Sequence, residues 1–482
     1  MIIMTDTQNR DMVGAYGTDA MSTPNLDRLA ASGLRFNRAY TTCPLCTPAR
    51  SAIFSGRHPQ VNGAWSNNMA PARNIPLMGE VFQYYGYEVA YTGKWHLDGS
   101  GYFGDGIAEG GFPQQWWYDG KCYLDDLGPA MEACYRRAQT VEDLRSGGFE
   151  ERFIWGHRVS DRAIAFLKQA QPPFLLVVSF DEPHAPSVAP PQWWEKWEEC
   201  DFSHFPEPIN FFAELENKPS LQHLQRANRT KPEWQAYLKR RAHFLACNSY
   251  IDHEIGRILN ELDRSHADDT TVIYTSDHGD MMGAHGLQGK GPMMYEEVIH
   301  VPLIIRSPSA PAGHVTEAVV SHLDILPTML ELGGIEIPEC LHGKSLVPLL
   351  RNPATRVHET VFSGFHRYAI NHDDWGEFYP IRCVMDGRYK LVINLFDLDE
   401  FYDLQEDPGE MINRIEDSAC TRERNRLHDI LLEEMDKIRD PFRSFHWGNR
   451  PWRQVRKMFY HGGKRRDRPR GFPFEADCKE AR

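Results

Sequence analysis

The sequence has no long hydrophobic run, and the longest obvious one is FLLVVSF, from Phe174 to Phe180. A helix that crosses a membrane needs about 20 apolar residues, so we expect no membrane association. The first residues, MIIMTDTQ, also lack the basic start, the apolar stretch and the cleavage site of a secretory signal. We therefore expect a cytoplasmic protein, or a periplasmic or exported one if the natural chain begins earlier.

Cysteine and excess positive charge are also lacking. Ten cysteines among 482 residues are too sparse for a disulfide scaffold, and most are expected to be buried thiols. The formal net charge of −14 would repel a polyanion except at a local basic patch. The composition thus excludes a general nucleic-acid binder, and nothing in it specifies an oligomeric state.

Short apolar, β-branched runs alternate with helical patterns along most of the chain. The expected strands are Ile2–Thr5, Glu88–Thr92, Phe174–Phe180, Thr271–Ser276 and Pro302–Arg306. A helix is expected in TPNLDRLAASG, with Thr23 as its cap and Pro24 in its first turn, and another over Phe244–Leu262. This alternation is typical of the α/β class, with a mostly parallel sheet and helices on both faces.

From about Glu377 the pattern of alternating strands and helices gives way to consecutive strand-like runs. IRCVMDGRYKLVINLF places Asp386 and Gly387 between two strand-like runs, which predicts an antiparallel hairpin. We expect a large unit over residues 1–375 and a smaller one over residues 376–482. The smaller unit would hold an antiparallel sheet, a closing helix over Cys420–Ile438 and a basic tail that contains RRDRPR.

Polar residues follow four of the expected strands directly. They are Asp6 after the first strand, Lys94 and His96 after the second, His184 after the third, and Asp277 and His278 after the fourth. Ligands of open α/β sheets bind beyond the carboxyl ends of the strands. Any one of these residues alone would more often be a cap or a loop residue, but the four groups together predict a functional site at one rim.

The acidic residues of this rim favour a hard divalent cation. Asp6, Asp277 and His278 offer mainly carboxylate oxygens. A zinc site would more often show several Cys or His ligands at short spacing, and the sequence has no such pattern.

Cys43 and Cys46 form a C-x-x-C pair within CPLCTPARSAIFSGR. The pair could be a redox couple, half of a metal clip, or a nucleophile with a neighbour. No second pair lies nearby to complete a four-thiolate site, and the position in the chain does not suit a thioredoxin-like role.

At this point the residues resemble a known family. CTPAR followed by SAIFSGR is similar to the first signature, C-x-P-x-R, of the formylglycine-dependent (type I) sulfatases, and GYEVAYTGKWH is similar to the second. The resemblance extends through DEPH, YTSDHGDMMGAHG, Lys290, VPLIIRSP and FYDLQEDPGE, and is strongest to bacterial members whose first strand ends in MTDTQ. It implies an alkaline-phosphatase-like catalytic domain over residues 1–375.

The resemblance implies that a separate formylglycine-generating enzyme oxidises Cys46 to formylglycine. The hydrated aldehyde would carry two hydroxyls, one to attack sulfur and one to expel sulfate as the carbonyl re-forms. It also implies one divalent metal ion, Ca²⁺ first and Mg²⁺ or Mn²⁺ as alternatives. The implied ligands are Asp6, Cys46 in its modified form, Asp277 and His278. Many members have a carboxylate where Thr7 stands, so Gln8 is a candidate for an extra ligand.

The remaining roles implied by the resemblance concern charge and protons. Arg50 would steady the formylglycine hydrate, and Lys94 and Lys290 would hold sulfate oxygens. His96 would take a proton from the hydrate, and His184, with or without Lys290, would protonate the leaving oxygen. The plainer alternatives are an ordinary surface arginine at position 50 and a solvated loop lysine at position 290.

The implied activity is hydrolysis of sulfate monoesters, and aromatic and polar residues near the rim suggest a sulfated saccharide such as a glycosaminoglycan fragment. The candidate substrate residues are Trp65, Asn67, Asn68, His366, Arg367 and Trp375. Alternatives are a phosphonate monoester or phosphodiester hydrolase of the same fold, a catalytically silent relative that binds sulfated glycans, and a redox protein. The G-K-x-H residues favour sulfate monoesters, because the phosphonate and phosphodiester enzymes generally lack them.

Overall fold

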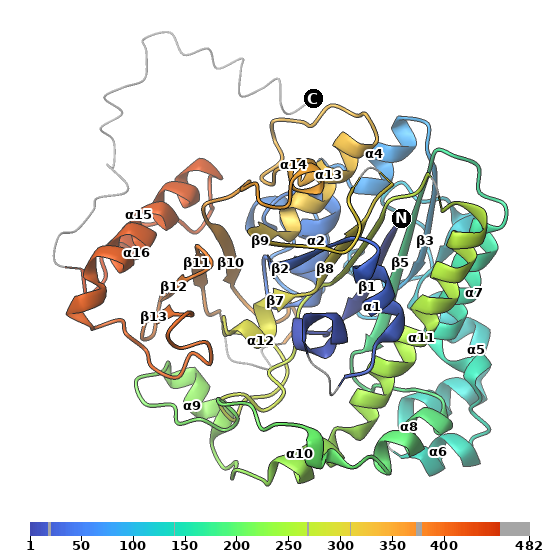
Figure 1. The fold of residues 1–482 in the computed structure, drawn as a ribbon, viewed down its shortest axis with the longest axis horizontal. Helices are drawn as coiled ribbons and strands as arrows, with labels where there is room; N and C mark the ends of the chain where they lie inside the picture. The colour runs from blue at the N-terminus through green and yellow to red at the C-terminus, as the bar shows by residue number, and fades with distance from the viewer. Residues whose placement is uncertain (18–20, 139, 268, 309, 373–377, 454–482) are drawn as a thin grey trace.

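Two β-sheets organise the chain in the computed structural model (Figure 1). The structure describes residues 1–17, 21–138, 140–267, 269–308, 310–372 and 378–453. Trp375 and the basic tail therefore lie outside the described residues. None of the helices in the described part of the chain is long and apolar enough to span a membrane.

The larger sheet has nine strands in the order β4-β3-β5-β1-β6-β8-β2-β7, with β9 beside β2. Its strands are β1 (Ile2–Asp6), β2 (Leu34–Tyr40), β3 (Glu88–Gly93), β4 (Trp117–Tyr118), β5 (Phe174–Pro183), β6 (Val272–Ser276), β7 (His300–Val301), β8 (Leu303–Arg306) and β9 (His314–Ser321). The five neighbouring strands β4, β3, β5, β1 and β6 are parallel to one another, and β2 is parallel to β9. Strand β8 is antiparallel to both β6 and β2. The five predicted strands correspond to β1, β3, β5, β6 and β8, and the predicted mostly parallel sheet is confirmed.

Helices cover both faces of this sheet because successive strand residues point to opposite sides. Ile3 of β1 belongs to one hydrophobic core, and Ile2 and Met4 belong to the other. The first core is built with α1 (Pro24–Ala31), α5 (Gly120–Arg137), α6 (Val141–Ser146), α7 (Trp155–Leu167), α8 (Pro191–Glu198), α10 (Trp234–Arg240) and α11 (Ala242–Ser265). The second is built with α2 (Cys46–Ser55), α4 (Met78–Tyr84), α13 (Ile325–Leu332) and α14 (Val347–Arg351).

The two predicted helices of this region are present, with one local difference. Thr23 precedes α1 but its side chain does not cap the helix. Its hydroxyl instead donates to Asp27 and accepts from the backbone N–H of Gly14, 2.8 Å away. Thr23 is therefore the N-cap residue, as predicted, but without a side-chain capping bond, because Asp252 accepts from the backbone N–H groups of Asn25 and Leu26.

The smaller sheet is antiparallel and follows the order β10-β11-β12-β13. Its strands are β10 (Val361–Phe365), β11 (Ile381–Met385), β12 (Tyr389–Asn394) and β13 (Glu400–Asp403), and α15 (Thr421–Lys437) and α16 (Phe445–Gly448) pack on it. The short helices α3 (Pro59–Asn62), α9 (Ser220–Arg226) and α12 (Glu296–Ile299) lie elsewhere in the chain. The predicted hairpin joins β11 to β12, and β10 precedes residue 376, the predicted start of the smaller unit.

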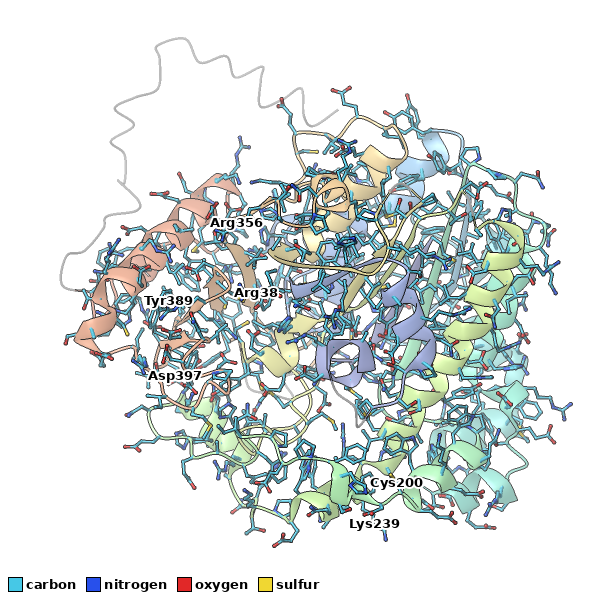
Figure 2. The ribbon with its side chains drawn as sticks, in the orientation of Figure 1. Arg38, Cys200, Lys239, Arg356, Tyr389 and Asp397 are labelled. Atoms are coloured by element: carbon cyan, nitrogen blue, oxygen red, sulfur yellow. The ribbon has the colours of Figure 1, made fainter. Side chains whose placement is uncertain are left out.

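The two sheets share a hydrophobic cluster, and a cleft is lined by residues from both of them. The cluster includes Tyr40 and Val319 of the larger sheet and Phe365 of the smaller one. The cleft has a volume of about 1010 Å³, and Arg38 and Tyr389 are among the residues that line it from the two sheets (Figure 2). The smaller sheet is therefore fixed beside β9 and β2.

A buried ion pair also ties the segment that follows α15 to the smaller sheet. Arg382 of β11 donates to both oxygens of Asp440, at 2.7 and 3.0 Å, and the two side chains are 3% and 0% exposed. Gln60 of α3 donates to the same carboxylate, which links it to the large unit.

We predict that Asp440→Asn lowers the free energy of unfolding by about 3–5 kcal/mol, because it leaves the Arg382 charge buried without a counter-charge. Urea denaturation followed by circular dichroism measures this loss. The control is Glu132→Gln, which breaks an exposed pair with Arg136 and should cost less than about 0.5 kcal/mol. Equal effects of the two substitutions would contradict the prediction.

Candidate active site

The ends of four neighbouring strands bring polar side chains together at one rim of the larger sheet. The sheet order places β3, β5, β1 and β6 side by side. These ends carry Lys94, Asp181, Asp6 and Asp277, and all four residues are buried. The clustering follows from parallel strands ending at the same edge of the sheet.

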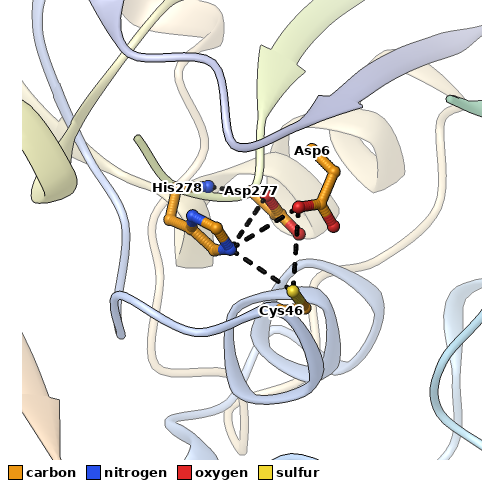
Figure 3. A group of neighbouring side chains, drawn as sticks. All are labelled: Asp6, Cys46, Asp277 and His278. Atoms are coloured by element: carbon orange, nitrogen blue, oxygen red, sulfur yellow. Dashed lines mark hydrogen bonds and ion pairs between the residues drawn. The ribbon is translucent and has the colours of Figure 1, made fainter. Parts of the chain in front are cut away.

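Cys46 is the first residue of α2, and its thiol faces Asp6 and His278 (Figure 3). Its Sγ lies 2.7 Å from Nζ of Lys290, 3.4 Å from Nε2 of His278 and 3.7 Å from Oδ1 of Asp6. Burial and Asp6 raise the pKa of the thiol, but Lys290, Lys94 and His278 outweigh them and hold it well below its usual value. The surroundings thus favour an anionic group at position 46.

Four of these side chains could hold a metal ion. Ligand atoms of Asp6, Cys46, Asp277 and His278 all lie within 4.8 Å of one another. The Nδ1 of His278 lies 2.9 Å from the carbonyl oxygen of Gly279, which can only accept, so in the neutral ring Nδ1 carries the proton and Nε2 can offer its lone pair to a cation. Two buried carboxylates and one imidazole lone pair fit a hard divalent cation.

Gln8, the candidate for an extra metal ligand, is engaged in other contacts. The side-chain oxygen of Gln8 accepts from Tyr274 and Thr5, and its nitrogen donates to Asn248 at 2.6 Å. Because these contacts use both ends of the amide, Gln8 is not among the ligand candidates that the geometry supports. Thr7 instead donates its hydroxyl to Asp6 at 2.6 Å.

Arg50 is fully buried and is not a surface residue. Its Nε lies 3.0 Å from Asp277, and its Nη2 lies 3.1 Å from Asp6. Its Nη1 donates to the carbonyl of Lys94 and to the hydroxyl of Ser179. The guanidinium therefore connects α2 to the ends of β1, β3, β5 and β6.

Lys94 follows a glycine that lies tightly against β5. A Cβ on Gly93 would lie 1.8 Å from the carbonyl oxygen of Ser179, so only glycine fits before the lysine. The Nζ of Lys94 lies 2.8 Å from Asp6 and 3.0 Å from Asp181. Lys290 reaches the site from a loop and is 6% exposed, so it is not a solvated lysine.

The two candidate proton-transfer histidines occupy different surroundings. Nε2 of His96 lies 3.0 Å from the side-chain oxygen of Asn68, and its Nδ1 is buried without a hydrogen-bond partner. His184 is half-buried, and its Nδ1 lies 2.8 Å from the hydroxyl of Tyr102.

Two residues of the site were missed by the sequence analysis. Asp181 pairs with Lys94, and Tyr102 donates its hydroxyl to Asp181. The position of Asp181 at the end of an apolar strand was a usable signal. Tyr102 lies in a glycine-rich loop, where no local pattern marks it.

Several candidate substrate residues make structural contacts instead. Trp65 and His366 pack edge to face in an aromatic group with Phe442, and His366 is 2% exposed. The side-chain oxygen of Asn67 accepts from the backbone N–H of Thr47. His366 is thus packed in the interior, because its ring fills space between the two units.

The other candidates are placed differently. Asn68 lies at the site but contacts His96 and Asn371. Arg367 is half-buried on the segment that follows β10. Asn68 therefore holds the ring of His96, a candidate proton-transfer residue, which the sequence could not reveal.

Comparison with known proteins gives consistent matches. The sulfatase family model matches residues 1–335, and the model of the N-sulphoglucosamine sulphohydrolase C-terminal region matches residues 283–437. The chain is 44% identical to the sulfatase YidJ of Escherichia coli (strain K12), over 96% of this chain and 92% of that protein. It is 26% identical to an N-acetylglucosamine-6-O-sulfatase of Bacteroides thetaiotaomicron, over 91% and 86% of the two chains.

Solved structures share the alkaline-phosphatase-like fold. One, in complex with its substrate D-glucosamine-2-N,6-O-disulfate, has a TM-score of 0.73 and 23% identity and covers 92% of this chain and 98% of its own. The phosphonate monoester hydrolase of Agrobacterium radiobacter has a TM-score of 0.74 and 21% identity and covers 91% and 95%.

We predict that Ca²⁺ stabilises the chelator-treated protein through the four candidate ligands. At a concentration of about 100 times the Kd, binding adds about 2.7 kcal/mol, which raises the Tm of a chain of this size by about 3 °C. Differential scanning calorimetry with and without Ca²⁺ measures the shift.

Asp277→Asn should abolish the Ca²⁺-dependent shift. Asp280→Asn is the matched control, because Asp280 is also buried but pairs with Arg241 outside the candidate ligand group. A shift that survives Asp277→Asn would show that Ca²⁺ binds elsewhere.

Proposed function

Because the chain belongs to the sulfatase family and is a sulfuric ester hydrolase, we propose that it removes sulfate from a sulfated saccharide, such as a glycosaminoglycan fragment, with a formylglycine made from Cys46 and one divalent cation. The observation that carries the proposal is the position of Cys46 among candidate metal ligands, with the Lys290 ammonium 2.7 Å from its sulfur.

Residues at the strand ends and at position 46 would supply the cation site and the formylglycine. Asp6, Asp277, His278 and the modified side chain at position 46 would bind the cation. The family resemblance makes Ca²⁺ the first expectation, with Mg²⁺ and Mn²⁺ as alternatives. When bound, formylglycine and the cation would supply an activated hydroxyl nucleophile and a route for sulfate release through a carbonyl.

The chain's own cations would bind and orient the sulfate. Lys94 and Lys290 lie 3.9 and 2.7 Å from Sγ of Cys46, where sulfate oxygens would approach the nucleophile. Their fixed positive charges would offset the charge that develops on those oxygens. Arg50 would keep Asp6 and Asp277 in place for the cation.

The histidines would move protons. Asn68 accepts from Nε2–H of His96, which leaves the Nδ1 lone pair free to take a proton from the group at position 46. His184 would donate a proton to the oxygen of the departing alcohol. His96 would thus act as a base and His184 as an acid.

Similarity to sulfatases of saccharides supports the proposed substrate class. The relatives include the N-acetylglucosamine-6-O-sulfatase described above and a Δ4,5-hexuronate-2-O-sulfatase, both of Bacteroides thetaiotaomicron and both 26% identical to this chain. The match to the N-sulphoglucosamine sulphohydrolase C-terminal model points the same way.

A phosphonate monoester hydrolase is the second candidate, because the phosphonate enzyme described above shares the fold. The buried Lys94 and His96 favour a sulfate monoester, since the G-K-x-H residues are generally missing from those enzymes. A silent glycan-binding relative would need a damaged site, whereas the nucleophile position, both lysines and both histidines lie together in this chain.

Maturation belongs to the proposal as well. Cys46 is 1% exposed, so we propose that the formylglycine-generating enzyme acts before the chain has folded. We also keep the cytoplasm as the proposed location, as expected from the sequence.

We predict that the active protein carries formylglycine at position 46. The tryptic peptide Ala39–Arg50 should be lighter than its unmodified form by the difference between a thiol and an aldehyde, and fragmentation should place the change at position 46. Mass spectrometry of a preparation with measured activity tests this.

Cys46→Ala should lower kcat for a sulfated glucosamine by at least about 10³-fold. The matched control is Cys43→Ala, because Cys43 is also buried but packs in the cluster between the sheets. A panel of sulfated saccharides and a phosphonate monoester would identify the preferred ester. An unmodified peptide from an active preparation would refute the formylglycine mechanism, and a preference for the phosphonate would refute the proposed substrate.

A further inference from the structure

Tyr102 connects Asp181 to His184 by hydrogen bonds. Its hydroxyl donates to Oδ1 of Asp181, and its oxygen lies 2.8 Å from Nδ1 of His184. Burial and the Asp181 charge raise the pKa of Tyr102 well above its usual value, so the phenol keeps its proton. Because that one proton is directed to Asp181, the phenol oxygen acts as an acceptor toward His184.

The contacts of His184 fix which ring nitrogen carries the proton. Nδ1 lies 2.7 Å from the carbonyl oxygen of Ala185, which can only accept. Nδ1–H is therefore shared between Ala185 and Tyr102, and Nε2 is the nitrogen that remains for the substrate. The backbone N–H of His184 also donates to the carbonyl oxygen of Asp181 at 3.0 Å, which fixes the loop.

Asp181 holds a second functional group at the same time. Its Oδ1 lies 3.0 Å from Nζ of Lys94, and its side chain is 3% exposed. Nζ of Lys94 also lies 3.9 Å from the centre of the Tyr102 ring, which adds a cation–π contact. One buried carboxylate thus anchors the ammonium directly and the imidazole through Tyr102.

We propose that Asp181 and Tyr102 are positioning residues that hold His184 as the proton donor to the leaving group. The inference rests on the proposed function. As the bond between sulfur and the leaving oxygen breaks, its electron pair stays on that oxygen, which takes the proton from Nε2. The sulfuryl group passes to the nucleophile at position 46, and His184 is left neutral with its proton on Nδ1.

A sugar alcohol needs this proton, because an alkoxide is a poor leaving group, whereas 4-nitrophenolate leaves without it. Tyr102→Phe keeps the ring beside Lys94 and removes the hydroxyl. We predict that it lowers kcat for glucosamine 6-sulfate by about 10–100-fold, a large part of the usual contribution of a general acid. For 4-nitrophenyl sulfate the loss should stay below about threefold, and KM should change little for both substrates.

Two further variants separate positioning from general damage. Tyr87→Phe is the matched control, since it removes a half-buried hydroxyl that donates to Gly333, and it should leave both rates unchanged. In a His184→Ala background, Tyr102→Phe should have no further effect on the sugar sulfate, because its partner is gone. Asp181→Asn should slow both substrates, since it also loosens Lys94, and the sugar sulfate more strongly.

The outcomes distinguish this inference from the proposed function. If the matured wild type hydrolyses no sulfate ester, the proposed function falls and the inference falls with it. If the wild type is active but Tyr102→Phe slows both substrates equally, slows neither, or adds its full effect to His184→Ala, the inference alone is overturned. Should Tyr102→Phe fail to fold, the same two-substrate comparison with Asp181→Asn decides: equal losses would overturn the inference.

Discussion

The ion pairs of Arg50 with Asp6 and Asp277 are the constraint on which the site depends. All three side chains are fully buried, where an unpaired charge costs several kcal/mol. Removing the guanidinium would leave two carboxylates in the interior with fewer cations to offset them. Because Arg50 lies one helical turn after Cys46, the contacts that satisfy its charge also fix the start of α2 against the ends of β1 and β6. The position of Cys46, the proposed nucleophile precursor, is thus a consequence of charge pairing in the core.

The balance of buried charges in the site explains how an acidic chain can bind an anionic substrate. The buried charges of the site are three carboxylates and three cations: Asp6, Asp181 and Asp277, and Arg50, Lys94 and Lys290. They cancel in number, so a bound divalent cation would leave the site positive. The chain as a whole carries a formal net charge of −14, which repels sulfate at long range. Attraction is therefore confined to the rim, where the low-dielectric surroundings strengthen it.

Strand ends were predictable from the sequence, whereas side-chain partners were not. Asp6 and Asp277 could be placed at one rim, because apolar runs mark parallel strands and parallel strands end at one edge. The side-chain oxygen of Gln8 accepts a hydrogen bond from Tyr274, which is remote in the sequence but adjacent in space. His366 similarly has the polarity of a substrate contact, and its burial follows from the packing of the two units. Such contacts arise only when distant segments meet, so local patterns do not contain them.

The two histidines show how neighbouring residues assign chemistry to identical side chains. In His96, the Asn68 oxygen accepts from Nε2–H and leaves Nδ1 without a proton. In His184, the Ala185 carbonyl accepts from Nδ1–H and leaves Nε2 as the nitrogen that can exchange a proton. The two neutral rings are therefore held in opposite tautomers, His96 with its proton on Nε2 and His184 with its proton on Nδ1. In the proposed reaction, which takes a proton at one step and gives one at another, these outer partners of the rings would determine which nitrogen of each ring takes part.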